Sequence, residues 1–239
     1  EGEHMNFQVT YFLECLSASF SKIPVSIGIA AVTLLIGLLV GTPIALIRVF
    51  HVKILDPVFT ALIAVVKAIP VNLIILIAGL WFNDNFNGIA QALGLSVTVA
   101  DVDKIYVAIW ALSIAAIALL SESVRGALLS VDHGQYEAGY AVGLTGFQTF
   151  TRIIMPQAFK NVLPALCNEF VVLLKETSVA GYVAVQDVLN AGIKVASIYY
   201  CYLEAYVAAA LIYWAISIIC IQAGKLAEKE LGRYRRSGI

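Results

Sequence analysis

The chain has 239 residues, of which 61% are hydrophobic and 13% are charged, and its mean hydropathy is +0.89. This composition is too apolar for an ordinary soluble domain. The formal net charge is −1, so no global electrostatic field recruits nucleic acid or an acidic surface, and nucleic-acid binding is excluded as a function.

The N-terminal residues precede the first long apolar run. Glu1 to His4 stand before the first methionine, Met5, and segment 1–5 is interpreted as a tag remnant with a start methionine. Residues 6–22 are moderately apolar and are expected to lie along the outer membrane surface. The first long apolar run begins after Pro24, and it is too long for a cleavable signal peptide.

Hydrophobic runs long enough to cross a membrane recur along the chain. A bilayer core about 30 Å thick needs roughly 20 apolar residues in helical conformation. Four runs meet this length comfortably: about 24–47, 57–82, 105–129 and 201–224. A fifth, about 161–185, is apolar at both ends but contains Asn168, Glu169, Lys175 and Glu176. If this fifth run is a span, the chain has five transmembrane helices. If it is an amphipathic soluble helix, the chain has four.

The distribution of Lys and Arg favours five spans. In that arrangement most basic residues fall on one side of the membrane, which the positive-inside rule makes the cytoplasm. They are Arg48, Lys53, Arg125, Arg152, Lys160, Lys225, Lys229, Arg233, Arg235 and Arg236. With four spans, the basic residues at 125–160 and those at the C-terminus would lie on opposite sides. The sequence therefore predicts an all-α membrane protein with about five transmembrane helices, its N-terminus outside and its C-terminus in the cytoplasm.

A polar segment at about 130–160 separates the third and fourth predicted spans. Asp132 can cap a short helix, and Gly143 permits a sharp change of direction after it. A second short helix is expected to follow Thr145 and to stop before Pro156, because proline lacks the needed N–H donor. Residues 6–239 are expected to form a single transmembrane domain that carries this segment as an insert.

The insert has features of a docking surface. Small residues at Ala138, Gly139 and Gly143 allow a partner to approach closely. Phe147 and Phe150 are expected to fill a pocket of that partner. The alternative interpretation is a solvated loop that only connects two spans.

The insert resembles the family signature of ABC importer permeases, which reads E-A-A, three residues, G, nine residues, I, one residue, L-P. The residues in register are Glu137, Ala138, Gly143, Ile153 and Pro156, with Gly139 in place of the second Ala and Met155 in place of the Leu. Other pieces resemble the polar amino acid uptake branch: Ser121–Gly126, Gly134–Glu137, Asn168–Phe170 and Leu174–Ser178. The resemblance implies the type I importer permease fold. It also implies that short coupling helices between the third and fourth spans dock on a cytoplasmic ATPase, with Glu137 orienting the first.

Ionisable residues within the predicted spans form a second candidate site. At about 1.5 Å per residue, Glu169 lies about 13 Å beyond Lys160, close to the midplane, and Lys67 lies about 15 Å deep in the second span. Asn168 and Lys175 are seven residues apart and share a helix face. An amino acid zwitterion could place its ammonium at Glu169 and its carboxylate at Lys67 or Lys175. The alternative is that these groups form internal salt bridges that fix helix packing.

The second span departs from the family pattern R-G-T-P, because it reads Lys67-Ala-Ile-Pro70. The exchange replaces a bidentate guanidinium with a point charge. Pro70 also removes a backbone hydrogen bond, and Asn72 can serve the freed polar groups.

Together these features indicate the permease subunit of an ATP-driven importer of polar amino acids in a bacterial inner membrane. The partners that the resemblance implies are ABC ATPase subunits, a second permease that is either a second copy or a homologue, an extracellular solute-binding protein and membrane lipid. The chain has no P-loop sequence, so ATP and Mg²⁺ are expected on the ATPase and no cofactor is expected here. The four cysteines lack metal-ligand spacing, so no metal site is expected.

Three alternatives stay open. The first is an importer of another small solute, such as an amino acid derivative, with the same architecture. The second is a passive channel. The third is a membrane-embedded enzyme, for which Glu122 with Glu169 or His133 is a poor catalytic set. If the chain imports polar amino acids, Glu169 favours a cationic or neutral zwitterion such as cystine, histidine or arginine.

Overall fold

The computed structural model describes residues 7–236, and the segment interpreted as a tag remnant lies outside the described residues. Within the described range all regular structure is helical. The chain divides into two compact units, each assembled from three stretches. The first unit holds the chain up to Thr33, Ile69–Ser113 and Val172–Ile218, and the second holds Leu34–Ala68, Ile114–Val171 and the chain from Ile219 onward. The single-domain organisation expected for 6–239 stays a prediction.

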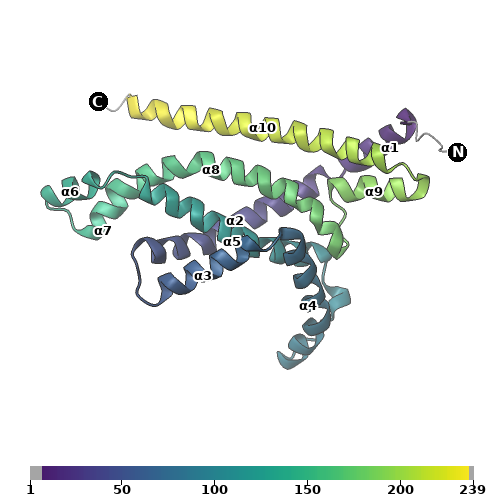
Figure 1. Ribbon diagram of the computed structural model, residues 1–239, viewed down its shortest axis with the longest axis horizontal. Coiled ribbons are helices and arrows are strands. Elements are labelled where there is room, and N and C mark those ends of the chain that lie inside the picture. Colours follow the sequence, from purple (N-terminus) through teal and green to yellow (C-terminus); the bar gives the residue numbers. More distant parts are fainter. Residues whose placement is uncertain (1–6, 237–239) are drawn as a thin grey trace. The chain divides into compact units, whose positions relative to one another are not determined.

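The helices vary widely in length (Figure 1). The α-helices are α1 (Val9–Phe20), α2 (Ile23–Val49), α3 (Leu55–Ala68), α4 (Val71–Ala92), α5 (Lys104–Leu129), α6 (Gly134–Ala141), α7 (Gly146–Thr149), α8 (Met155–Glu176), α9 (Val188–Tyr199) and α10 (Tyr202–Arg236). Two 3₁₀ segments cover Val99–Asp101 and Thr177–Val183, and a π-helical turn covers Phe150–Ile154.

The all-helical membrane fold predicted from the sequence is confirmed. Helices α2 and α5 match the expected spans at 24–47 and 105–129 closely, and α10 covers the one at 201–224. Among the described residues, four helices are long and apolar enough to cross a membrane: α2, α4, α5 and residues Tyr202–Leu226 of α10. The two short helices expected between the third and fourth spans are α6 and α7.

The prediction of one continuous helix over 57–82 is wrong. The chain forms α3 up to Ala68 and begins α4 at Val71, and α4 then runs ten residues past the expected end, to Ala92. The break lies at Pro70, whose backbone is extended with ψ 136°. Proline lacks an N–H and disfavours helical backbone at the residue before it, which is Ile69.

The expected span at 161–185 also differs from the structure. Helix α8 begins earlier, at Met155, and ends at Glu176, after which the chain tightens into the 3₁₀ segment Thr177–Val183. The Thr177 hydroxyl donates to the carbonyl of Leu174 at 2.8 Å. A side chain that bonds the preceding turn competes with regular helix geometry, and this accounts for the change of helix type.

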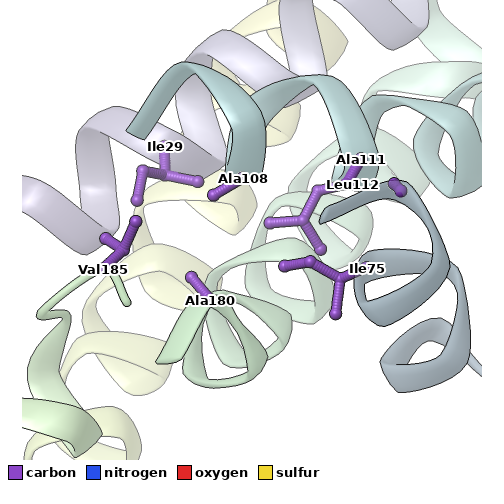
Figure 2. Close-up of a cluster of buried hydrophobic side chains, with 8 residues drawn as sticks. Ile29, Ile75, Ala108, Ala111, Leu112, Ala180 and Val185 are labelled. Atoms are coloured by element: carbon purple, nitrogen blue, oxygen red, sulfur yellow. The ribbon is translucent and has the colours of Figure 1, made fainter. Parts of the chain in front are cut away.

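The first unit has an apolar core built from four elements. Ile29 of α2, Ile75 of α4 and Leu112 of α5 meet in a buried cluster that also contains Ala180 of the 3₁₀ segment. Figure 2 shows their side chains pointing toward one another, with Val185 closing the cluster. This core fixes the chain just after α8 against α4 and α5.

A second cluster in the first unit holds the N-terminal helix. Helix α1 packs along α9, and the two lie side by side in Figure 1. Cys15 of α1 and Cys201, before α10, are buried together in this cluster with small residues of α9 and α10.

The second unit has two apolar clusters. One consists of Leu128, Ile154 and Ala158 with other buried side chains, and Leu46 and Phe150 pack against them. The other joins α2, α3 and α5 and consists of Ile44, Ile63 and Ala118, with neighbouring apolar side chains of α3 and α5 packed on it. The first of these clusters also packs Tyr136 of α6 against the residues of α5 and α8.

Candidate functional site

Helix α6 begins and ends at the residues that the sequence indicates. The carboxylate of Asp132 accepts the N–H of Gly134 at 2.7 Å, so Asp132 satisfies a free donor at the helix start. After α6 the backbone of Gly143 is left-handed, with φ +81°. The N–H of Leu144 reaches back to the carbonyl of Gly139 at 3.1 Å, the pattern of a helix end that requires glycine.

A close contact between Gly139 and Thr149 braces α6 against α7. Both residues are buried, and a Cβ atom at Gly139 would lie 2.5 Å from Cγ2 of Thr149. The second Ala of the family signature would therefore not fit here unless Thr149 moved. The departure from the signature at this position has a packing reason, which the sequence alone does not reveal.

Helix α7 starts as expected and ends at Thr149, before Pro156. The side chains of Thr145 and Gln148 form a reciprocal capping box at its N-terminus. The chain then continues through the π-helical turn into α8, where Pro156 is the second residue. The second short helix therefore stops before Pro156, as predicted. The proline itself does not end the helical path, because in the first turn of α8 it forfeits an N–H that has no partner within that helix.

The remaining signature residues divide between an exposed face and the core. Glu137, Ala138 and Phe147 are exposed, and Phe147 keeps 77% of its surface accessible. Ile153 and Phe150 instead pack within their own unit, and the ring of Phe150 lies 5.4 Å from that of Phe50. Of the two phenylalanines expected to fill a partner pocket, only Phe147 is free to do so.

Tyr136 marks the boundary between this face and the core. It packs against the cluster around Leu128 and Ile154, and burial raises the pKa of its hydroxyl above the ordinary value. The hydroxyl therefore stays neutral at physiological pH, and α6 contributes no new charge on its buried side.

The structure brings together two of the four residues predicted to contact cargo. The hydroxyl of Ser123 on α5 donates to Glu169 on α8 at 3.1 Å. The positive charge of Lys67 on α3 interacts favourably with the same carboxylate. Asn168 is exposed beside Glu169 on α8. Lys175, also exposed, belongs to the first unit, so the structure does not join it to this group.

Sequence reasoning missed the ion-pair cluster at the C-terminal end of α2. Arg48, only 7% exposed, places Nη1 2.7 Å from Oε1 of Glu122 and donates through Nε to Thr60 at 3.1 Å. Arg125 contacts the other oxygen of Glu122 at 3.4 Å. In the sequence Arg48 counted only as a loop charge for topology. Arg48 and Glu122 lie at the same expected depth on two different spans. That equal depth is the sequence signal that could have predicted their contact.

A second missed group lies in the first unit. Asp187 is fully buried and accepts hydrogen bonds from the hydroxyl of Tyr213 at 2.6 Å and from the backbone N–H of Asn190 at 2.9 Å. Thr177 contacts the same carboxylate at 3.5 Å, and Ser26 accepts the N–H of Val188. The sequence signal is an aspartate three residues before an asparagine at the start of an apolar helix, the pattern of an N-cap.

No group of three or more His, Cys, Asp or Glu residues that could hold a metal ion occurs within residues 7–236, as far as their side chains are described. The candidate residues fall into three groups: the α6–α7 segment, Glu169 with Ser123 and Lys67, and the ion-pair cluster of Arg48, Glu122 and Arg125.

Known proteins with this sequence pattern and fold are transport components. The family model "Binding-protein-dependent transport system inner membrane component" matches residues 27–232. The probable amino-acid ABC transporter permease protein PatM of Vibrio harveyi is 30% identical over 96% of this chain and 98% of its own length. The L-cystine transport system permease protein TcyL of Bacillus subtilis is 30% identical over 87% of this chain and 85% of its own length.

The fold agrees with these sequence matches. A crystal structure of an amino acid ABC transporter with histidines superposes with a TM-score of 0.77 at 26% identity, covering 95% of this chain and 99% of that one. The chain therefore belongs to the family of binding-protein-dependent transport system inner membrane components and is a multi-pass permease subunit of an ABC transporter.

Proposed function

We propose that this permease imports polar amino acids, with its N-terminus outside the cell and its C-terminus in the cytoplasm. Its partners are ABC ATPase subunits, a second permease and an extracellular solute-binding protein. The names of the relatives support an amino acid cargo, because one is a probable amino-acid permease and another an L-cystine permease. The concentration of Lys and Arg on one side of the predicted spans supports the orientation.

The observation that carries the ATPase partnership is the braced α6–α7 pair. Packing of Gly139 on Thr149 makes the pair rigid, while Phe147 stays 77% exposed. Tyr140 and Val142 on the same segment are exposed too, and several large apolar side chains exposed together are typical of an interaction site. In the proposed complex Phe147 enters a groove of the ATPase, and Glu137 and Ala138 lie on the docking face.

The other signature residues support this docking face from behind. Gly143 turns the chain between the two helices, and Ile153 anchors the π-helical turn in the apolar cluster. Pro156 then starts α8, the helix that carries Glu169. A push on α6 and α7 is therefore transmitted along a continuous helical backbone toward the proposed cargo site.

The proposed cargo site uses opposite charges for the two ends of a zwitterion. Glu169 binds the ammonium group and Lys67 the carboxylate, while Asn168 and Lys175 contribute polar contacts along α8. Ionisable groups within a membrane are costly and mark substrate paths by default. ATP binding and hydrolysis by the partner would switch the spans between outward-facing and inward-facing packings around this site.

The test is ATP-dependent uptake of labelled arginine, histidine and cystine into vesicles that contain the complete transporter. Glu169→Gln removes the charge that binds ammonium and is expected to abolish uptake while ATPase subunits still co-purify. Glu137→Ala is expected to weaken ATPase docking, so that less ATPase co-purifies. The matched control is Asp84→Ala, which removes an exposed carboxylate on α4 and should change neither readout.

Two results would contradict the proposal. Full uptake in Glu169→Gln would remove the role of its charge. Labelling of cysteines at His133 or Lys160 from outside intact cells would reverse the orientation and remove the cytoplasmic docking face.

A further inference from the structure

A cleft of about 400 Å³ opens in the second unit beside the ion-pair cluster. Its polar lining comes from Arg48 of α2, Thr60 and Lys67 of α3 and Glu122 of α5, and Ala64 lies between the two polar residues of α3. We name this hollow the inner cleft. It differs from the group around Glu169, which does not line it.

The inner cleft runs along one face of α3. Thr60, Ala64 and Lys67 are spaced by four and three residues, so they stack on the same face over about 10 Å. Lys67 occupies the end nearest the break at Pro70 and also acts on Glu169. Thr60 occupies the end nearest the loop that joins α2 to α3. One lysine thus belongs to both the proposed cargo site and the inner cleft.

The charges of the residues that line the inner cleft favour an incoming carboxylate. Both oxygens of Glu122 are engaged, one by Arg48 at 2.7 Å and the other by Arg125 at 3.4 Å. The hydroxyl of Thr60 likewise accepts from Arg48 and donates to Asp56, which does not line the cleft. Lys67 adds a positive charge on an exposed side chain. The lining residues thus carry two cations and one carboxylate, and that carboxylate is already paired with guanidinium groups.

We propose that the inner cleft is a second, cytoplasmic-side station on the translocation path, which holds the carboxylate of a departing amino acid at Lys67. The proposal rests on the import function and orientation proposed above. A cargo molecule leaving Glu169 keeps its carboxylate on Lys67 while its body moves along Ala64 and Thr60. The Arg48–Glu122–Arg125 cluster closes the side of the cleft and repels no carboxylate, because its own negative charge is neutralised.

The test measures whether cargo protects a cysteine placed in the cleft. The four native cysteines are first replaced by alanine, and the complete transporter is studied in inside-out vesicles with an anionic thiosulfonate reagent. Ala64→Cys reports the cleft, and Val65→Cys, a 58% exposed neighbour outside it, is the matched control. The probe is whichever of arginine, histidine and cystine the cysteine-free parent takes up.

We expect Ala64→Cys to react, and cargo at about ten times its apparent dissociation constant to slow the reaction about tenfold by occupancy. The rate at Val65→Cys should not change. Adding Lys67→Gln to Ala64→Cys should remove the protection, whereas Lys67→Arg should retain it.

The inference is overturned if Ala64→Cys reacts equally fast with and without cargo, or does not react, while the parent transports. Equal protection at Val65→Cys would also overturn it, since the effect would then be global. If the parent takes up none of the three amino acids, the proposed function fails first.

Discussion

Two carboxylates in this permease are stabilised by different means. Asp187, in the first unit, is fully buried and is surrounded by neutral donors: the hydroxyl of Tyr213 and the amide groups of Asn190. Glu122, in the second unit, is 27% exposed and lies between two guanidinium groups. Removing the Asp187 carboxylate leaves buried donors without an acceptor. Removing the Glu122 carboxylate leaves the buried guanidinium of Arg48 without the negative charge that it pairs with.

The neutral hydrogen bonds at Asp187 and the ion pairs at Glu122 constrain the surrounding helices differently. Neutral hydrogen bonds converge on Asp187 from several segments and specify one arrangement of the 3₁₀ segment and α9. The pairing of Glu122 with Arg48 is instead an interaction between two whole charges from two separate helices. The first region therefore fixes geometry, and the second lies beside the proposed path of a charged substrate.

The largest effect is expected from Glu122→Ala. Arg48 is 7% exposed and would lose its 2.7 Å partner, so the free energy of unfolding should fall by about 3 kcal/mol. The double variant Arg48→Met/Glu122→Leu should recover most of this loss, because it leaves no unpaired charge. The measurement is equilibrium unfolding in mixed detergent micelles.

Arg125→Gln serves as the control for that variant. Arg125 is 34% exposed and 3.4 Å from Glu122, so its loss should cost less than about 1 kcal/mol. Equal losses for Arg125→Gln and Glu122→Ala would show that burial of Arg48 does not set the cost.

The next largest effect is expected from Asp187→Asn. An asparagine of nearly the same size offers one acceptor oxygen, and its NH₂ group faces donors, so at least one buried donor loses its partner. The expected loss in the free energy of unfolding is about 2 kcal/mol. Tyr213→Phe removes a single donor and should cost about 1 kcal/mol in the same unfolding experiment. If Asp187→Asn proved neutral, neutral donors would not be what holds this region.

The α6–α7 segment and the Arg48–Glu122 pair differ in how far the sequence predicts them. Glu137, Gly143 and Thr145 carry local signals, and the structure places α6, its turn and the capped start of α7 where those signals indicate. The pairing of Arg48 with Glu122 joins residues 74 positions apart. Nothing local encodes that contact, because it depends on how separate helices pack.

Departures from the expected spans have local causes that length and hydropathy do not capture. The sequence indicates that Pro70 removes one backbone hydrogen bond, but the apolar residues on both sides of it favour a single continuous helix. At the other discrepancy, Thr177 bonds the preceding turn and the helix tightens. The contact of Gly139 with Thr149 could not be predicted either, since it requires the angle between α6 and α7.

The contact between Gly139 and Thr149 allows a test in which neither a charge nor a hydrogen bond is removed, and its expected effect on the free energy of unfolding is smaller. Gly139→Ala would bring a Cβ atom to 2.5 Å from Thr149 and should reduce the free energy of unfolding by about 1 to 2 kcal/mol. Thr149→Ala in the same chain removes the clashing atoms and should restore much of the loss. The coupling energy from the two single variants and the double variant checks this. Strict additivity would show that the two residues do not touch.

The smallest effect concerns Asp101, an exposed counterpart of Asp187 that neutral donors also bind. The backbone N–H and then the hydroxyl of Thr98 donate to its carboxylate, and they lower the pKa of Asp101 below its ordinary value of 3.8. Because the folded-state pKa is lowered, the stabilisation is complete above pH 3.8 and is lost as the pH falls through the lowered pKa. Thr98→Val should raise this pKa part of the way, and Thr98→Ser should not, as followed by carbon NMR of the labelled carboxyl. An unchanged pKa in Thr98→Val would assign the whole shift to the backbone N–H. In that case the hydroxyl of Tyr213 would also be expected to stabilise the Asp187 carboxylate less than the N–H of Asn190 does.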